Sequence, residues 1–556
     1  MTFWEHFLRL LPHKPIAALA ALYWHATQRR VRARNRLHAA SADLPFAYDV
    51  WVDRIERVPE SEPQLRSVIA AWNNKPAFTL VLVPSADADP AKVARTQRSL
   101  ESQIYPCWKF ADGVGCSYAR DADYIVPIHV GDRLATSALF RFAEALQAEP
   151  DTAILYGDHD YIDANGRRRR PWFKPEWNQE MFLAQDYISP AVAIDRRLFQ
   201  QVDEDFGTTT DLPALMIQAV AKADGSILHV PHIVLHVDDT RIELTAGSRV
   251  AAVQQHVATL GASCSEGPFG TVKISWPLPA DLPLVSLIVP TKDKLELLRA
   301  CLESVFERTT YPNYEILVVD NASTDVRALA YLAHLEVRPR VRVLRYAEGY
   351  NFSAINNHAA ARARGTFLCM LNNDTEIIEP DWLTELMRYA VRPDVGAVGA
   401  KLLYEDGSIQ HAGVVVGIGE AAGHAHRFLP ADEPGYFRQA HVSHAVSAVT
   451  AACLVVEKRK YEAVGGLDEE WLKIAFNDVD LCLKLQAAGW RNIYVPHAVL
   501  VHHESKSRGS DMSSKNIERY MRELRVLQER WHTKTYNDPV HNPNLDRYNE
   551  TFVFRI

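Results

Sequence analysis

A polar cluster containing a carboxylate follows a short apolar run in the second half of the chain. The run is residues 367–371, and the cluster is Asn372-Asn373-Asp374, with Glu376 just beyond it. A short unbroken apolar run is typical of a buried parallel strand, and open α/β sheets bind ligands where such strands end. Divalent cations prefer carboxylate oxygens and leave positions open for phosphate. Asp374 is therefore predicted to hold a cation on a diphosphate; the alternative is a turn before the helix that follows Pro380.

Two further polar positions could serve the same ligand. A second apolar run ends at Asp320, and an acidic residue at a strand end can accept hydrogen bonds from a base or ribose. The alternative is an Asp that caps the next helix. Asn357 lies on a helix expected after Gly349 and could also reach a nucleotide, although a plain capped helix explains it equally well.

The elements that must position these side chains occur twice. Residues 78–84 and 285–290 are strand-like runs that end in proline and precede a polar loop and a helix, and Val-Pro-His recurs at 230–232 and 495–497. Such recurrence indicates an internal duplication. Strands alternating with helices in each half predict an α/β fold with mainly parallel central sheets.

The whole chain limits the classes of protein to consider. With 556 residues it is too long for one core, and its net charge of -8 argues against a general nucleic-acid binder. Seven scattered cysteines without a CxxC pair suit a reducing cytoplasm and provide no structural zinc site. We expect five segments: a helical extension 1–75, a first α/β domain 76–245, a linker 246–283 containing several prolines, a second α/β domain 284–510, and a C-terminal helix and tail 511–556.

The N-terminal segment leaves two interpretations open. Residues 15–24 are apolar but too short to span a bilayer, and an arginine-rich run follows at 29–36. No convincing cleavage site for a signal peptide follows. An apolar helix with a basic flank could rest on an anionic membrane surface, which would make the protein peripheral at the inner face of the cell membrane. A surface helix that packs on the protein itself accounts for the same pattern.

Residues 284–508 resemble a family 2 glycosyltransferase with the GT-A fold, of the bacterial O-antigen, capsule or rhamnan type. The resemblance is carried by Val289-Pro290, by residues 319–325 and by residues 371–376. The metal motif D-x-D of that family stands here as Asn372-Asn373-Asp374, with Asn in place of its first carboxylate. The resemblance implies a divalent cation, Mg²⁺ or Mn²⁺, on Asp374 and His502, with His503 as the fallback ligand. It also implies donor-binding residues, namely Pro290, Thr291, Asp320, Asn357, Asn372, Asn373, Lys506 and Arg508.

The acceptor half of the family is matched around residues 476–484. The resemblance implies that the second member of an acidic pair is the general base, and here the pair is Asn477-Asp478. A carboxylate beside a sugar hydroxyl can take its proton as the oxygen attacks. Without the family, Asp478 could equally cap the helix that it precedes. The acceptor-binding residues implied are Thr450, Gly466, Asp468 and Asn477.

The first half resembles the second but departs from it at the chemical positions. Asp132 matches Asp374, whereas Thr209 stands near the position of Asp478 and only Asp211 matches Asp480. A threonine is no proton acceptor, so this half is expected to be a degenerate copy. Two active domains are the alternative.

The activity implied is metal-dependent, inverting transfer of a sugar from a nucleotide-diphosphate donor to a glycan acceptor, lipid-linked glycans included, in surface-polysaccharide synthesis. The rival is a carbohydrate-binding scaffold of two inactive domains. A dinucleotide-binding fingerprint at Gly417 is weak because it stands alone. Gln528 to Trp531 resembles a motif of processive polysaccharide synthases but is one residue short, and no membrane-spanning run accompanies it.

Overall fold

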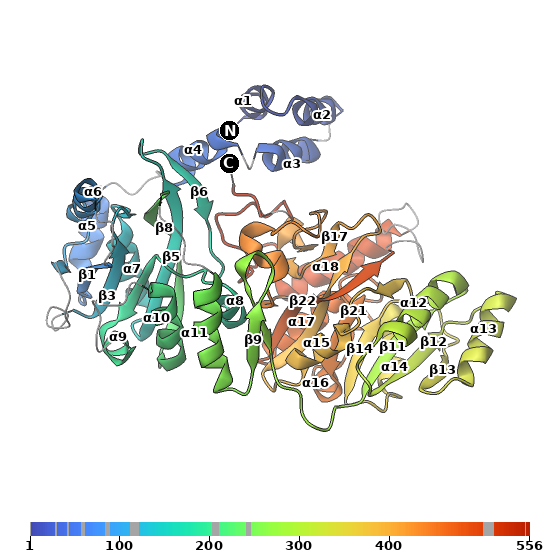
Figure 1. The fold of residues 1–556 in the computed structure, drawn as a ribbon. Coiled ribbons are helices and arrows are strands. Elements are labelled where there is room, and N and C mark those ends of the chain that lie inside the picture. Colours follow the sequence, from blue (N-terminus) through green and yellow to red (C-terminus); the bar gives the residue numbers. More distant parts are fainter. Residues whose placement is uncertain are drawn as a thin grey trace.

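The structure, a computed structural model, describes residues 2–27, 30–41, 44–56, 62–83, 89–111, 122–202, 211–240, 246–503, 516–550 and 552–555. Two mixed sheets lie side by side, one in each half of the chain, and N-terminal helices rise above them (Figure 1). Within the described ranges, every helix is too short or too polar to cross a membrane.

The first half is built on an eight-stranded sheet with the order β2-β1-β3-β7-β5-β8-β4, and β6 is added beside β5. Pairs β1–β2, β1–β3 and β5–β8 are parallel, and the other pairs are antiparallel. The strands are β1 (Phe78–Val83), β2 (Trp108–Ala111), β3 (Tyr124–His129), β4 (Arg133–Leu134), β5 (Thr152–Ile162), β6 (Arg168–Trp172), β7 (Val192–Asp195) and β8 (Ser226–Asp238). The helices are α6 (Pro90–Glu101), α7 (Ala138–Ala148), α8 (Gln179–Ala184), α9 (Arg196–Val202) and α10 (Leu212–Lys222).

The second half is built on a ten-stranded sheet with the order β13-β12-β11-β14-β21-β16-β22-β15, and β17 and β20 pair with β16 and β22. Its first four strands are mutually parallel. The sheet consists of β11 (Val285–Thr291), β12 (Tyr314–Asp320), β13 (Val341–Arg345), β14 (Phe367–Leu371), β15 (Thr375–Ile377), β16 (Val395–Leu403), β17 (Ile409–His411), β20 (His444–Val446), β21 (Cys453–Glu457) and β22 (Arg491–His502). A small hairpin is formed by β18 (Val414–Val416) and β19 (Ala422–His424).

Helices cover both faces of the second sheet. They are α12 (Leu295–Arg308), α13 (Val326–Glu336), α14 (Phe352–Ala360), α15 (Trp382–Ala390), α16 (Lys458–Ala463) and α17 (Asn477–Ala487). Short 3₁₀ segments are η4 (Ile418–Glu420) and η5 (Tyr436–His441). Strands β12 and β14 are buried along their whole length, which explains why both are unbroken apolar runs in the sequence.

The two sheets repeat one strand order. The order β2-β1-β3-β7-β5-β8-β4 in the first sheet corresponds, strand by strand, to the order β12-β11-β14-β21-β16-β22-β15 in the second. The hairpin partner is also repeated, since β6 pairs with β5 as β17 pairs with β16. The predicted fold class, two similar α/β domains with helical extensions, is confirmed.

Residues 246–283, expected to be a linker, contain α11 (Ala246–Ala258), β9 (Ser263–Glu266), η3 (Pro268–Gly270) and β10 (Val272–Ser275). Val253, Val257 and Trp276 belong to the same hydrophobic cluster as the first strands of the second sheet. The segment therefore packs as part of the core between the halves.

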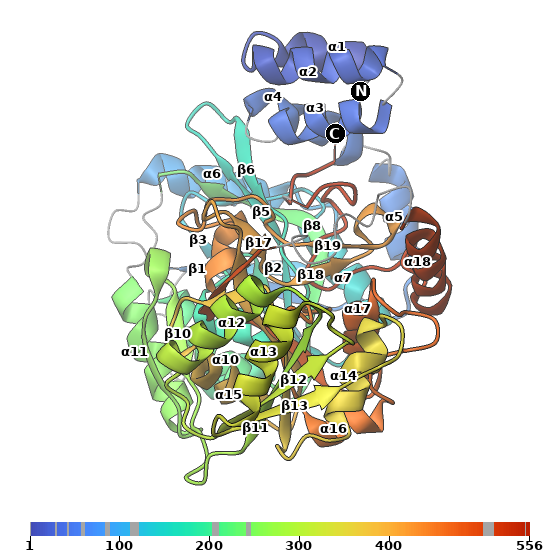
Figure 2. The same ribbon diagram turned by 90° about the vertical axis from the view of Figure 1, so that its right-hand side faces the viewer.

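The extensions are helical at the N-terminus and mixed at the C-terminus. The N-terminal elements are α1 (Phe3–Leu10), α2 (Pro15–Ala26), α3 (Arg30–Ser41), α4 (Pro45–Trp51), the π-helix η1 (Val52–Glu56) and α5 (Glu62–Ala71). The C-terminal helix α18 (Ile517–Trp531) packs beside α17, and the tail after it returns toward the first half (Figures 1 and 2).

Buried polar contacts join the two halves. Glu180 of α8, 2% exposed, forms ion pairs with Arg392 and Arg491 of the second half. The tail residue Asn542 donates to the Asp158 carboxylate in the first half, at 3.0 Å from Nδ2 to Oδ2. These contacts fix the first half against the domain that carries the predicted site.

Candidate functional site

The carboxyl ends of β11, β12 and β14 bring three of the predicted donor residues to one edge of the second sheet. Thr291 and Asp320 are register partners at the ends of β11 and β12. Asn373, directly after β14, donates from Nδ2 to Thr291 Oγ1 at 3.0 Å. Parallel strands end at the same edge, so three segments distant in sequence meet there. Pro290 precedes Thr291 in β11 and pairs with Val319.

Asp320 is held on two sides. Its Oδ1 accepts the backbone N–H of Ser323 at 3.1 Å, and its Oδ2 forms an ion pair with Arg345 Nη1 at 2.8 Å. The carboxylate thus orders the turn after β12 and also pairs with an arginine from β13. Arg345 was not predicted from the sequence, where an isolated arginine in a strand gives no signal of a partner.

Asp374 and His502 come together at the end of β14 and β22. The distance from Asp374 Oδ1 to His502 Nε2 is 3.2 Å, and Asp374 is 3% exposed. The pairing of β15 with β22 sets this geometry, because Thr375 is the register partner of His502. Asn372 adds its amide, with Nδ2 at 3.3 Å from His502 Nε2.

Gln410 fixes the orientation of the His502 ring. His502 Nδ1 lies 2.6 Å from Gln410 Oε1, so Nδ1 carries the proton and donates it to this amide oxygen. Nε2, which lies 3.2 Å from Asp374 Oδ1, then carries the lone pair through which an imidazole can bind a metal. In metal-binding histidines, the ring nitrogen that does not bind the metal usually donates its proton to a neighbouring acceptor, and this hydrogen bond fixes the tautomer. Gln410 was missed by sequence reasoning, because nothing in its neighbours marks it.

His503, the fallback ligand, faces a different pair of groups. Its ring nitrogens contact Glu405 and Glu376, with 2.8 Å from Nε2 to Glu376 Oε1. Consecutive residues of an extended strand point to opposite sides. The geometry therefore favours His502 over His503 as the partner of Asp374.

The pair Asp374 and His502 fits an open cation site rather than a closed one. Within the part of the chain that the structure describes, no cluster of three or more His, Cys, Asp or Glu side chains is arranged to hold a metal. A carboxylate oxygen and an imidazole lone pair facing each other at 3.2 Å suit a cation shared between them. Further ligands could come from a bound phosphate, from water or from the Asn372 amide. Lys506 and Arg508, predicted to neutralise phosphate, lie outside the described residues.

Asp478 is connected to this edge through one turn. It lies in the first turn of α17, and its Oδ2 accepts the N–H of Ala451 at 3.1 Å, while Oδ1 accepts the N–H of Val479 at 2.9 Å. The next residue of that turn, Ala452, accepts the N–H of Asn372 at 3.0 Å. The predicted base and the predicted cation ligands therefore flank the short segment that leads into β21. Each carboxylate oxygen keeps a lone pair for a hydroxyl.

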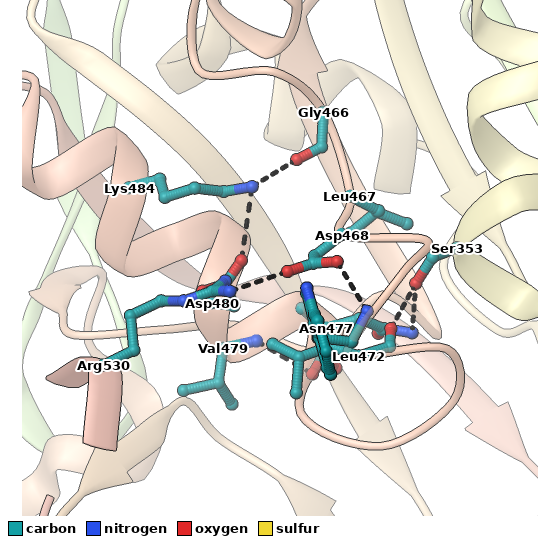
Figure 3. A network of polar contacts seen from close by, with 12 residues as sticks. Ser353, Gly466, Leu467, Asp468, Leu472, Asn477, Val479, Asp480, Lys484 and Arg530 are labelled. Carbon is teal, nitrogen blue, oxygen red and sulfur yellow. Dashed lines mark hydrogen bonds and ion pairs between the residues drawn. The ribbon is translucent and has the colours of Figure 1, made fainter. Parts of the chain in front are cut away.

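Behind Asp478, a buried charge network ties α17 to the C-terminal helix (Figure 3). Asp480, fully buried, accepts from Arg530 Nη1 and Trp531 Nε1, both at 2.8 Å, and pairs with Lys484 Nζ at 3.2 Å. Arg530 also donates to Asp468 Oδ2 at 2.8 Å. Although burial opposes the charged guanidinium, its hydrogen bonds to the two carboxylates raise the pKa of Arg530 above its usual value.

Arg530 and Trp531 belong to a run that the sequence analysis noted but to which it assigned no role. They end the run Gln528 to Trp531, whose likeness to a synthase motif was rejected for want of membrane-spanning segments. Their contacts with Asp480 show that α18 supports the helix that carries Asp478.

Two of the predicted acceptor residues, Gly466 and Asp468, lie in the loop between α16 and α17, and Asn477 is the first residue of α17. Gly466 has φ +64°, and a Cβ there would lie 2.7 Å from Asn357 Oδ1, so the position requires glycine. Asp468 accepts the N–H groups of Glu470 and Trp471 and orders the loop. Asn477 is 3% exposed and donates to Ser353 Oγ at 3.1 Å (Figure 3).

Asn357, predicted to reach the nucleotide, is engaged with that same loop. Its Nδ2 donates to Leu467 O at 2.8 Å and to Glu469 Oε2 at 2.9 Å, and its Oδ1 accepts from Leu467 N at 3.1 Å. The amide is thus saturated by loop contacts. Thr450, in the turn beside Asp478, is partly exposed, and its hydroxyl accepts the N–H of Ala452 at 3.4 Å.

The first half contains counterparts of the cation ligands in a different environment. Arg133, which follows Asp132, is the register partner of His236, just as Thr375 is the partner of His502. His236 Nδ1, however, contacts the buried Asp160 at 2.5 Å, and Asp132 Oδ1 accepts the N–H of Asp238 at 2.9 Å. Asp211 caps α10 by accepting from Ala214 N at 3.0 Å. Thr209 lies outside the described residues.

Comparison with known proteins gives a family-model match that lies within the second half of the chain. Residues 286–418 match the family model described as Glycosyl transferase family 2. The chain is 36% identical over 545 residues to the uncharacterized protein y4gI of Sinorhizobium fredii (strain NBRC 101917 / NGR234), covering 88% of this chain and 60% of that one. It is 33% identical over 519 residues to the O-antigen biosynthesis protein RfbC of Myxococcus xanthus, covering 84% and 40%.

A shorter match covers 42% of this chain and 79% of its relative, at 27% identity over 263 residues. That relative is the N-acetylglucosaminyl-diphospho-decaprenol L-rhamnosyltransferase of Mycobacterium tuberculosis (strain ATCC 25618 / H37Rv). The chain thus spans 60% and 40% of the two longer relatives. The stretch of the second half that contains the strand-end motifs, residues 286–418, is thus similar to glycosyl transferase family 2.

Proposed function

We propose that the second half transfers a sugar from a nucleotide-diphosphate donor to a glycan acceptor, with inversion at the anomeric carbon. One observation carries the proposal: Asp478 and the pair Asp374 and His502 flank the same turn, residues 450–452. A group that can accept a proton and a pair that can hold a cation are thus placed on either side of one small region. The family match and the similarity to the O-antigen biosynthesis protein RfbC and to the rhamnosyltransferase support this assignment.

The donor would bind along the edge formed by Thr291, Asp320 and Asn373, with its base or ribose toward Asp320. Asp374 and His502 would hold Mg²⁺ or Mn²⁺ there, and Asn372 lies beside them. Such a cation supplies positive charge that stabilises the leaving diphosphate. Lys506 and Arg508 remain proposed phosphate contacts.

Asp478 would act on the acceptor. As the acceptor oxygen bonds to the anomeric carbon, its proton passes to the Asp478 carboxylate, and the bond from that carbon to the diphosphate oxygen breaks with its electron pair. Two backbone N–H donors hold the carboxylate in place. Because attack comes from the face opposite the leaving group, the product has the inverted configuration.

The residues predicted to bind acceptor divide into two groups. Thr450 is partly exposed beside Asp478 and remains a proposed acceptor contact. Gly466 and Asp468 shape the loop between α16 and α17, and Asp468 also binds Arg530 of α18. Asn477 donates to Ser353 of α14, and Asn357, on the same helix, donates to the loop. We propose that these four position the acceptor side of the site.

For the whole chain we propose a role in surface-polysaccharide synthesis, with a glycan or lipid-linked glycan as acceptor. The first half would hold the second in place without chemistry of its own, because His236 and Asp132 are engaged by neighbouring groups. A bifunctional enzyme is the competing proposal, and the variant Asp132→Ala with Asp211→Ala separates the two. Loss of one sugar from the product, with the other linkage kept, would show two active sites.

A panel of nucleotide-diphosphate sugars tests the proposal, with nucleotide release measured in Mg²⁺, in Mn²⁺ and in excess chelator, followed by linkage analysis of the product. We expect release with at least one donor in metal, and its loss in chelator and in Asp374→Ala. Full activity in chelator would refute the cation. Glycan binding without turnover of any donor would instead show a carbohydrate-binding scaffold.

A further inference from the structure

Helices α1 and α2 expose an unusual concentration of large apolar side chains. The exposed fractions are 54% for Trp4, 64% for Leu8, 82% for Ile16, 55% for Leu19 and 63% for Tyr23. Single exposed apolar residues are normal on protein surfaces and need no explanation. Five within twenty residues, on two neighbouring helices, form a patch, here called the α1–α2 patch.

The five side chains lie on the outward faces of the two helices. Trp4 and Leu8 are spaced i, i+4, and Ile16, Leu19 and Tyr23 are spaced i, i+3, i+7, so each set forms one stripe. The opposite faces contribute to a small core made of Phe7, Leu10, Ala17, Ala18, Ala21 and Leu37. The helices run antiparallel, since the rings of Phe3 and His25 stack at 3.9 Å.

The patch lies at the edge of the molecule. In both views α1 and α2 are outermost, and α3 and α4 separate them from the rest of the protein (Figures 1 and 2). The buried faces of α1 and α2 supply the small core, and the exposed stripes lie outside it. A surface outside the chain is therefore the natural occupant.

Charge identifies the kind of surface. Residues 1–41 contain seven Lys and Arg but one acidic residue, Glu5, in a chain whose net charge is -8. Arg9, Arg30 and Arg36 are exposed, and Arg34 is exposed while its guanidinium lies 4.8 Å from the Tyr548 ring. Apolar stripes with aromatic residues and flanking arginines are typical of helices that lie in the interface of an anionic bilayer.

We propose that the α1–α2 patch docks the protein on the surface of an anionic lipid bilayer. The helices have 8 and 12 residues, so they would lie in the plane of the interface with Trp4, Leu8, Ile16, Leu19 and Tyr23 inserted. Arg9 of α1 would lie near the headgroups, and the arginines of α3, behind the patch, would add to the positive charge on this end of the protein. This goes beyond the proposed transfer reaction and does not depend on it.

Co-sedimentation of the full chain with vesicles tests the proposal, using phosphatidylcholine alone and phosphatidylcholine mixed with phosphatidylglycerol. We expect binding to the anionic vesicles, weakened by salt, and little binding to the neutral ones. The triple variant Leu8→Glu, Ile16→Glu, Leu19→Glu should lose it. The matched control is Val326→Glu with Val337→Glu, two positions that are each 79% exposed and lie far from the patch in sequence, and it should bind as the parent does.

A charge variant, Arg30→Glu with Arg36→Glu, should lower affinity about 20-fold or more, because each cation near an anionic surface contributes about fivefold. Circular dichroism and thermal melting confirm that the variants fold. No binding to anionic vesicles, or parental binding by the triple variant, would overturn the proposal. So would a dimer in vesicle-free solution that the triple variant dissociates, since a second copy would then cover the patch. Transfer to a soluble acceptor should be unchanged in the triple variant, which keeps this test separate from that of the reaction.

Discussion

Replacing Asp478 with asparagine tests the assignment of the base. The side chain keeps its size, but it can no longer take a proton. General-base assistance is typically worth about 100- to 10,000-fold, or roughly 3 to 5 kcal/mol of transition-state stabilisation. We expect turnover at saturating donor and acceptor to fall by that factor. Donor affinity should barely change, because the Asp478 carboxylate accepts hydrogen bonds from Ala451 and Val479 and not from residues of the donor edge.

The structure also sets the expected cost in stability. The carboxylate accepts two backbone N–H groups, and an amide offers only one oxygen, so one hydrogen bond is lost at a cost of about 1 kcal/mol. Such a loss leaves the fold intact at 25 °C. The variant should therefore melt slightly lower but bind donor normally, as measured by calorimetric titration in the presence of metal.

Asp480→Asn is the matched control on the same helix. Asp480 is fully buried against Arg530, Trp531 and Lys484, and the substitution removes the buried charge that pairs with these two cations. Losses of this kind cost about 3 to 5 kcal/mol, so this variant should be marked by a lower melting temperature. If Asp478→Asn instead loses donor affinity while bound donor still turns over, Asp478 belongs to the donor site and the proposed mechanism is wrong.

Three other predictions follow from the contacts. Gln410→Leu removes the acceptor that sets the His502 tautomer and should weaken metal-dependent donor binding about 10- to 100-fold. Glu376→Gln, beside His503, is the control, and equal effects of the two variants would refute the assignment of His502. Glu180→Ala removes the buried carboxylate that pairs with Arg392 and Arg491 between the halves and leaves these arginines paired with Asp394. It should lower the free energy of unfolding by about 1.5 to 3 kcal/mol, measured by denaturant titration, and an unchanged midpoint would contradict this. Burial raises the pKa of Asp538 from 3.8 to about 6, so the folded state binds the extra proton and stability falls as pH rises from about 4 to about 6, by at most about 3 kcal/mol. Asp538→Asn should remove that part of the slope, and an identical pH profile in both proteins would refute it.

The sequence by itself determined the class of fold and the identity of the strand-end residues. The apolar runs ending at Leu371 and Asp320 are unbroken because β14 and β12 are buried on both faces, and that pattern can be read without coordinates. The ends of parallel strands share one edge, so the meeting of Thr291, Asp320 and Asn373 followed from the fold class. The duplicated order of elements was visible for the same reason, since each strand and helix leaves a local periodicity.

Tertiary structure alone decided which side chains face one another across long sequence separations. The choice of His502 over His503 depends on the register of β15 against β22, and shifting that register by one residue would exchange their faces. Gln410, Arg345 and Arg530 are polar residues without a local pattern, so only packing shows that they hold His502, Asp320 and Asp480. Asn357 illustrates the reverse: its position on a helix near the strand ends suggested a ligand contact, but its amide is used by a loop more than a hundred residues later, whose path no local signal describes.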